Sequence, residues 1–119
     1  MKIVYASRTG NVESIVNALN MDAMMISDGS ESVVEPYILF TYTDGWGDVP
    51  YEVESFLANK ENATNLKGVV VSGDTSYGEA YCLAGDKISE EYHVPCLYKV
   101  ENEGNEDDIN EIKKLVLNA

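Results

Sequence analysis

Residues 2–19 read KIVYASRTGNVESIVNAL, and this stretch decides the fold. Residues 2–6 form a short apolar run of the kind that makes a buried strand. Four apolar residues then recur at helical spacing: Val12, Ile15, Val16 and Leu19. They make one face of a helix that ends near Asn20. A strand followed directly by an amphipathic helix is the repeating unit of a parallel sheet with crossover helices.

The same alternation continues along the rest of the chain. Further strands are predicted at residues 23–26, 37–42, 68–71 and 94–100. Three further helices are predicted: one that starts at Pro50 and is closed by the polar residues 62–65, one with Ala80, Leu83, Ala84 and Ile88 facing inward, and one capped by Asn105. We therefore expect residues 1–119 to form a single α/β domain.

Composition excludes several classes of protein. The 119 residues are 45% apolar, which is enough for a core and argues against intrinsic disorder. Eight Lys and Arg against 21 Asp and Glu give a net charge of −13, which repels nucleic acids and anionic membranes. The sequence shows no apolar span of ~20 residues and no signal-peptide pattern, so we expect a cytoplasmic protein.

Few residues are available for acid–base, thiol or metal chemistry. Cys82 and Cys96 are far apart in sequence and lack the companions of a zinc site, which favours reduced packing thiols over a redox pair. His93 is the only histidine, so Ser7 has no base for a hydrolase mechanism. The acidic residues 106–108 either form a docking patch or stabilise the N-terminus of the last helix, and we favour the helix. No metal site in the protein is expected.

The first loop, residues 7–12, has the composition of an anion site. Ser7 and Thr9 supply hydroxyl groups, Gly10 permits close backbone approach, and the following helix begins with free N–H groups. This combination suits a phosphomonoester. The loop lacks the Gly-x-Gly-x-x-Gly of dinucleotide sites and the Gly-Lys of a Walker A loop. The alternative is that Ser7 and Thr9 only cap the helix.

Two more loops follow strands at the edge of the sheet where open α/β folds bind ligands. The second loop, residues 43–50, holds Trp46 between two glycines, and this ring either stacks on a planar ligand or packs over the sheet edge. The glycines either let the peptide after Gly45 flip or form an ordinary turn. The third loop, residues 72–79, adds Tyr77. Two aromatic side chains beside a phosphate loop predict flavin mononucleotide (FMN).

Four motifs in order along the chain resemble the NrdI family, the flavodoxin-like accessory proteins of class Ib ribonucleotide reductase. They are Thr9-Gly10-Asn11-Val12, Thr41-Tyr42-Thr43-x-Gly45-x-Gly47-x-Val49-Pro50, Ser72-Gly73, and Ala84-Gly85-Asp86-Lys87-Ile88-Ser89 with Tyr92-His93-Val94-Pro95. The first loop also resembles the Ser/Thr-x-Thr-Gly-x-Thr pattern of flavodoxins and departs from it at Val12.

The resemblance implies a flavodoxin-like, doubly wound sheet of five parallel strands in the order 2-1-3-4-5, with helices on both faces. It also implies that reduced FMN reacts with O2 and supplies a superoxide-level oxidant to the dimanganese centre of the reductase small subunit, where a tyrosyl radical forms. The implied partners are that subunit and an electron donor that reduces the flavin. A minimal flavodoxin that carries single electrons is the alternative. A receiver-like domain is disfavoured because residues 6–8 contain no acidic cluster.

The same resemblance assigns roles to single residues. Gly45 is the redox-responsive peptide beside flavin N5, and Trp46 and Tyr77 flank the ring. The residues expected to contact FMN are Ser7, Arg8, Thr9, Gly10, Asn11, Val12, Thr43, Asp44, Gly45, Trp46, Gly47, Ser72, Gly73, Tyr77 and Gly78.

Acidic residues dominate the predicted mouth of the site. Asp44, Asp48, Asp74 and Glu79 lie in the second and third loops against a single expected cation, Arg8. A negative field disfavours an anionic reduced flavin, so we expect it to lower the potential of the second electron.

Overall fold

A sheet of five parallel strands runs through the centre of the molecule in the order β2-β1-β3-β4-β5. The computed structural model describes residues 1–119. The strands are β1 (Lys2–Tyr5), β2 (Ala23–Met25), β3 (Tyr37–Tyr42), β4 (Leu66–Gly73) and β5 (Cys96–Glu101). The predicted α/β class and strand order are confirmed.

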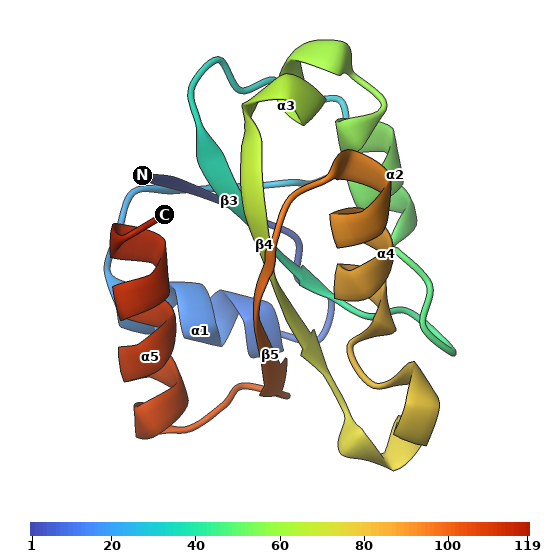
Figure 1. The fold of residues 1–119 in the computed structure, drawn as a ribbon, viewed down its shortest axis with the longest axis vertical. Helices are drawn as coiled ribbons and strands as arrows, with labels where there is room; N and C mark the ends of the chain where they lie inside the picture. Colours follow the sequence, from blue (N-terminus) through green and yellow to red (C-terminus); the bar gives the residue numbers. More distant parts are fainter.

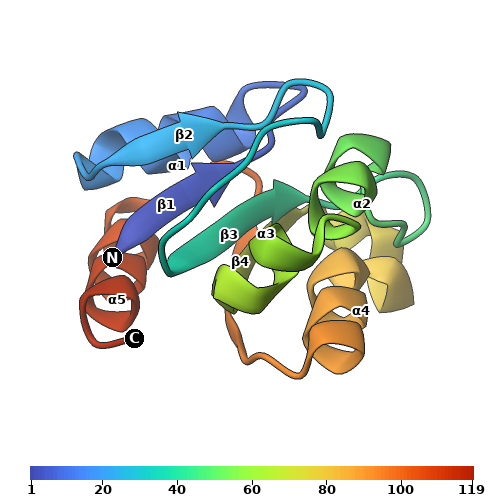
Figure 2. The same ribbon diagram turned by 90° about the horizontal axis from the view of Figure 1, so that it is seen from above.

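Helices cover both faces of this sheet (Figure 1, Figure 2). One face carries α1 (Asn11–Leu19) and α5 (Glu106–Leu117), and the other carries α2 (Tyr51–Leu57), α3 (Lys60–Asn65) and α4 (Leu83–Tyr92). A short 3-10 helix, η1 (Thr75–Ala80), lies between β4 and α4. Because all five strands are parallel, the loops that follow them gather at one edge of the sheet.

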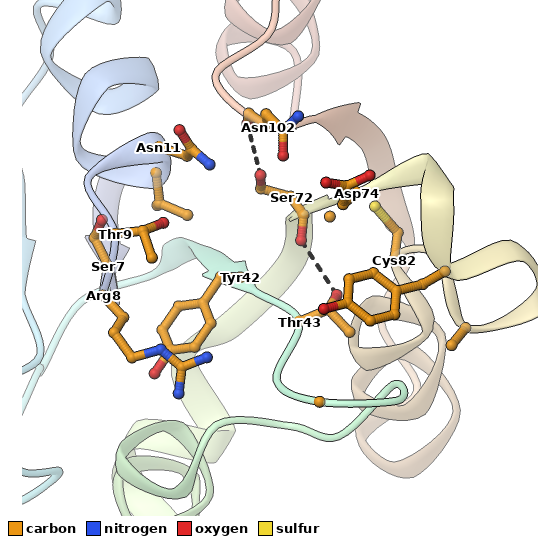
Figure 3. A pocket seen from close by; sticks show the side chains of 15 residues that line it. Ser7, Arg8, Thr9, Asn11, Tyr42, Thr43, Ser72, Asp74, Cys82 and Asn102 are labelled. Carbon is orange, nitrogen blue, oxygen red and sulfur yellow. Dashed lines mark hydrogen bonds between the residues drawn. The ribbon is translucent and has the colours of Figure 1, made fainter.

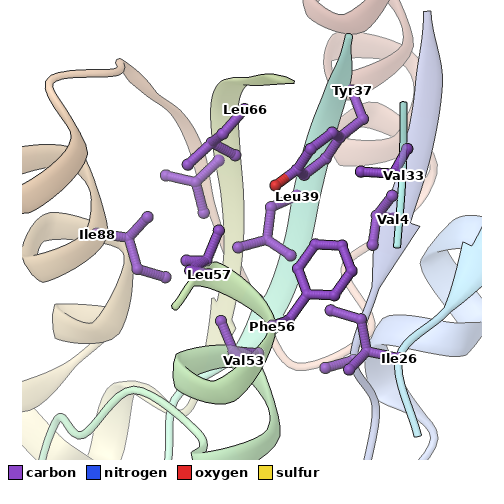
Figure 4. Packing of buried hydrophobic residues seen from close by; sticks show 12 residues of the cluster. Val4, Ile26, Val33, Tyr37, Leu39, Val53, Phe56, Leu57, Leu66 and Ile88 are labelled. Carbon is purple, nitrogen blue, oxygen red and sulfur yellow. The ribbon is translucent and has the colours of Figure 1, made fainter. Parts of the chain in front are cut away.

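Side chains alternate between two apolar layers because successive strand residues point to opposite faces. Ile3 and Ile38 pack with the residues of α1 and α5, whereas their neighbours Val4 and Leu39 pack toward α2 and α4. Figure 4 shows this second layer, in which Phe56 of α2 lies among strand residues. All five of these side chains are buried. This double layer is the reason that the central strands are continuous apolar runs.

The last helix begins at the cap predicted from the sequence. The side chain of Asn105 accepts a hydrogen bond from the N–H of Asp108 at 2.9 Å, and the Asp108 carboxylate accepts one from the N–H of Asn105 at 2.9 Å. This reciprocal capping box satisfies two backbone donors. Glu106 and Asp107 complete an acidic first turn, as the helix interpretation required.

The prediction that polar residues close the second helix is wrong, because residues 60–65 form a separate helix, α3. Asn62 in α3 is fully buried, and its side chain donates to the carbonyls of Glu31 and Phe56 at 2.9 and 3.0 Å. It also accepts from the N–H of Val33 at 2.9 Å. Hydrogen bonds rather than apolar contacts hold α3, so no hydrophobic stripe marks it.

Several other boundaries differ from the prediction. Ala80 belongs to η1, and α4 begins at Leu83. Strand β4 starts two residues early, at Leu66. Strand β5 starts at Cys96 instead of residue 94, because His93 ends α4 in a left-handed conformation and Pro95 has no N–H to donate to the ladder.

Candidate functional site

A pocket opens at the edge of the sheet where the strands end, between the loops that follow β1, β3, β4 and β5 (Figure 3). Its open space is about 700 Å³, including the part exposed to solvent. The residues that line it are Ser7, Arg8, Thr9, Asn11, Val12, Tyr42, Thr43, Gly45, Ser72, Gly73, Asp74, Tyr77, Ala80, Cys82 and Asn102.

The first loop presents backbone donors that nothing in the chain accepts. The N–H groups of Thr9, Gly10, Asn11 and Val12 make no hydrogen bond within the protein. The hydroxyl of Ser7 accepts the N–H of Glu13 at 3.2 Å, so Ser7 does cap the helix in part. Gly10 has a φ of 96°, and a Cβ placed on it meets no atom within 4 Å. The loop thus combines free donors with open space, which fits an anion at a helix N-terminus.

The second loop is a tight turn closed at its base. Asp44 and Asp48 exchange backbone hydrogen bonds of 2.9 and 2.7 Å. Between them Gly45 and Gly47 take positive φ values of 48° and 103°. A Cβ on Gly47 would lie 2.6 Å from Cδ2 of Leu83, so this glycine allows the loop to approach α4 closely.

The third loop is tied to its neighbours through Ser72. The hydroxyl of Ser72 donates to the carbonyl of Asn102 at 2.6 Å, and its own carbonyl accepts from the hydroxyl of Thr43 at 3.2 Å. Figure 3 shows both contacts crossing the pocket floor. The Asp74 carboxylate caps η1 by accepting the N–H of Ser76 at 2.9 Å, and this bond lowers the pKa of Asp74. These contacts join the loops after β3, β4 and β5.

The cation of the first loop is fixed against the second loop. A guanidinium nitrogen of Arg8 lies 2.9 Å from Oδ1 of Asp44, and the hydrogen bond between them raises the pKa of Arg8. The guanidinium carbon also lies 4.9 Å from the centre of the Tyr42 ring. The hydroxyl of Tyr42 in turn donates to Glu52 at 2.7 Å, and burial together with this bond raises the pKa of Tyr42.

The two aromatic side chains predicted to flank a ligand contact each other. The rings of Trp46 and Tyr77 meet edge to face, with centroids 5.0 Å apart and an interplanar angle of 83°. Tyr77 lines the pocket, whereas Trp46 does not and is 74% exposed. A planar group can enter between them only if one ring moves.

The expectation of a single cation at the mouth is wrong, because Lys87 of α4 reaches the second loop. Its ammonium nitrogen lies 3.6 Å from Oδ1 of Asp48. Asp44 and Asp48 are therefore both paired with a cation, and only Asp74 and Glu79 of the four carboxylates are not. The field at the mouth is less negative than the sequence indicated.

Comparison with known proteins assigns the family. The profile of the family described as NrdI flavodoxin-like matches residues 3–114 of this chain. The chain belongs to the NrdI flavodoxin-like family. It is 41% identical to Protein NrdI of Macrococcus caseolyticus over 111 residues, which are 93% of this chain and 84% of that protein. It is 39% identical to the SPbeta prophage-derived protein NrdI of Bacillus subtilis over 92% of this chain and 86% of that protein.

Two solved flavodoxin structures share this fold. A short-chain flavodoxin associated with a non-canonical PDU bacterial microcompartment superposes with a TM-score of 0.70 and 23% identity, covering 98% of this chain and 93% of that one. Two-electron reduced flavodoxin from Megasphaera elsdenii gives a TM-score of 0.68 and 19% identity, with coverage of 99% and 98%. At such identities the likeness concerns the fold alone, and it agrees with the strand order of this NrdI family member.

Most residues predicted for the site of this NrdI family member lie around one pocket. Ten of them line it: Ser7, Arg8, Thr9, Asn11, Val12, Thr43, Gly45, Ser72, Gly73 and Tyr77. Five sit in the same loops without lining it: Gly10, Asp44, Trp46, Gly47 and Gly78. The predicted contact set did not include the lining residues Tyr42, Asp74, Ala80, Cys82 and Asn102.

Cys82 and Asn102 reach the pocket from segments that carry no sequence motif. Cys82 is buried with a left-handed backbone at the start of α4, and burial raises the pKa of its thiol to about 11. Asn102 follows β5, and its N–H donates to the carbonyl of Gly73 at 2.8 Å. Asn102 could have been predicted from topology alone, because it directly follows β5 and all parallel strands end at the edge of the sheet that holds the site.

Two further properties concern the whole molecule. No three His, Cys, Asp or Glu side chains cluster in a way that would hold a metal ion. None of the helices combines the length and the apolar character needed to span a membrane.

Proposed function

We propose that this pocket binds FMN and that the chain is a flavoprotein that serves a ribonucleotide reductase. The observation that carries the cofactor proposal is the set of four unpaired N–H groups at the first loop, beside a pocket whose other walls come from the second and third loops. Membership of the NrdI family and a flavodoxin fold support the same assignment. The link to the reductase rests on what the family resemblance implies.

The first loop would hold the phosphate of FMN. The N–H groups of Thr9, Gly10, Asn11 and Val12, with the hydroxyl of Thr9, offer donors to a dianionic phosphate, as backbone amides at helix N-termini commonly do. Space for it exists because a Cβ on Gly10 would meet no atom within 4 Å.

The second and third loops would hold the flavin ring. Tyr77 lines the pocket and offers a stacking surface, while Gly45 presents its peptide from the second loop. Because Trp46 now contacts Tyr77, ring binding between them requires Trp46 to turn away. Trp46 is mostly exposed and lies between two glycines with positive φ, so this movement breaks little packing.

The bound flavin would supply the redox chemistry, and the protein would set its position and field. We propose that electrons pass from reduced FMN to O2 and that the resulting superoxide-level oxidant is delivered to the dimanganese centre of a class Ib small subunit. The residues of this chain would orient the ring and leave its edge accessible at the open mouth of the pocket. An electron donor for the flavin is a necessary second partner.

The runner-up is a one-electron carrier of the flavodoxin type. This chain shares its fold with a short-chain flavodoxin. Both roles use the same pocket, so fold and cofactor do not separate them. They differ in product, because only the activator generates a manganese-coupled tyrosyl radical in its partner.

Titration with FMN and with riboflavin tests the cofactor site. A phosphate held by several amide donors makes FMN bind more tightly than riboflavin by about tenfold or more, since one hydrogen bond to a charged group contributes ~1.5–3 kcal/mol. The Thr9→Val variant should lower the ratio of FMN affinity to riboflavin affinity, because it removes the hydroxyl donor of Thr9. Thr64→Val is a matched control, because the Thr64 hydroxyl bonds to the Lys60 carbonyl on α3, away from the pocket. Equal affinity for the two flavins, or no binding of either, would contradict the proposal.

A further inference from the structure

The second loop is held by an ion pair at each end. Asp44 pairs with Arg8 of the first loop at 2.9 Å, and Asp48 pairs with Lys87 of α4 at 3.6 Å. The backbone groups of the two aspartates are also bonded to each other. The three residues between them, Gly45 to Gly47, contain two positive-φ glycines and make no ion pair. Ion pairs thus tie the two ends of the loop to the first loop and to α4.

Two groups direct Arg8 to this loop. Besides Asp44, its guanidinium faces the ring of Tyr42, whose hydroxyl is anchored on Glu52. Figure 3 shows the Arg8 side chain extending beside Tyr42 and away from Asn11. The two contacts therefore place the guanidinium beside the second loop: one nitrogen faces the Asp44 carboxylate and the plane lies over the Tyr42 ring.

We propose that Arg8 and Asp44 form a latch that ties the first loop to the second and positions the Gly45–Trp46 peptide, and that Arg8 is not a ligand of the cofactor phosphate. Asp44 is then a positioning residue, because it acts through Arg8 and through the loop. This inference rests on the proposed FMN site for its ligand test only. The latch itself consists of contacts within the chain and does not require the cofactor.

The exposure of the pair sets the size of the effect. The Arg8 and Asp44 side chains are 57% and 40% exposed, so solvent and salt weaken their attraction. Exposed ion pairs shift an equilibrium by about two- to fivefold. An ion pair of this strength favours one position of the loop tip and still allows the tip to move.

Trp46 is the only tryptophan and lies in the latched tip, so its fluorescence anisotropy in the ligand-free protein reports the latch directly. We expect Arg8→Met and Asp44→Asn each to lower the anisotropy by the same amount, and the double variant to lower it no further. Added salt at about 0.5 M should reproduce the change in the wild type and not in the double variant. The control is Lys99→Met, which breaks an ion pair of 2.8 Å and similar exposure between β5 and α4 and should leave Trp46 unchanged.

Flavin affinities then separate the latch from a phosphate contact. The latch predicts that Arg8→Met weakens FMN and riboflavin alike, by about two- to fivefold, so the ratio of their affinities is unchanged. Loss of about tenfold for FMN alone would show that Arg8 binds phosphate and would overturn the proposal. Unaltered anisotropy in Arg8→Met would overturn it as well. If the wild type binds neither flavin, the cofactor proposal fails, and the anisotropy experiment still decides the latch.

Discussion

Replacing Gly47 with alanine tests whether the second loop needs a glycine to approach α4. Two separate costs follow from the structure. Gly47 has a φ of 103°, a region that costs an L-residue about 1–2 kcal/mol. Its new Cβ would also lie 2.6 Å from Cδ2 and 2.9 Å from Cβ of Leu83, against the ~3.5–4.0 Å of ordinary carbon contacts.

Rotation of the Leu83 side chain relieves only the first of these clashes, because its Cβ is fixed to the helix. Overpacking of this kind costs about 1–3 kcal/mol. The expected loss in the free energy of unfolding is therefore about 2–5 kcal/mol for Gly47→Ala, the sum of the strain and the clash.

Gly10→Ala is the matched control because Gly10 has a φ of 96° and no atom lies within 4 Å of the place its new methyl group would take. It should lose only the strain, about 1–2 kcal/mol. Urea unfolding followed by circular dichroism measures both variants. For FMN affinity we expect the opposite order, with Gly10→Ala the more harmful of the two variants. The added methyl group of Gly10→Ala enters the proposed phosphate space and therefore weakens the binding of FMN more than that of riboflavin. Equal destabilisation of the two variants would refute the reasoning about Leu83.

Three more predictions concern buried groups and the charge of the mouth. Asn62→Ala should lower the free energy of unfolding by about 3 kcal/mol, because it removes three hydrogen bonds to backbone groups, and two of these bonds are buried. Asn65 donates to the carbonyls of Val33 and Glu61 at 3.4 and 3.1 Å in less buried surroundings, so Asn65→Ala should lower it by only about 1 kcal/mol. Equal losses in urea titrations would contradict this account. Burial raises the pKa of Cys82 to about 11, so the contribution of its protonated thiol to the free energy of unfolding is complete below pH ~8.5 and declines as the pH rises toward 11. The reaction of Cys82 with a disulfide reagent in the folded protein should accelerate over the same pH range. Fast labelling at neutral pH would contradict the burial of this thiol. Asp74→Asn should raise the reduction potential for the second electron more than Asp44→Asn does, because the Asp44 carboxylate is already paired with Arg8. Spectroelectrochemistry on the FMN-loaded variants measures both potentials, and the electrostatic argument is contradicted if neither potential changes.

The fold could be predicted where apolar pattern decides it. The apolar run at residues 37–42 and the helical spacing of Val12 to Leu19 both correspond to buried elements. Helix α3 was not predicted, because the side chain of Asn62 holds it in place by hydrogen bonds to distant carbonyls, and sequence periodicity does not indicate such bonds. The start of β5 was predicted too early, because His93 ends the preceding helix in a left-handed conformation.

The site could be predicted to the level of its loops and not of its charges. The three motif-bearing loops do meet around one pocket because parallel strands end at the same edge. Lys87 was missed because it reaches the second loop from a helix 39 positions after Asp48. The edge-to-face contact of Trp46 with Tyr77 depends on side-chain rotamers, which the sequence alone does not determine.

The most direct test of the proposed function is electron paramagnetic resonance of a manganese-loaded class Ib small subunit. The subunit is mixed with O2 and with this protein carrying chemically reduced FMN, and a parallel sample omits the protein. The proposal predicts a tyrosyl radical coupled to manganese only in the complete mixture. If FMN binds and is reoxidised by O2 while no radical appears, the activator role is contradicted and the chain is a small electron carrier.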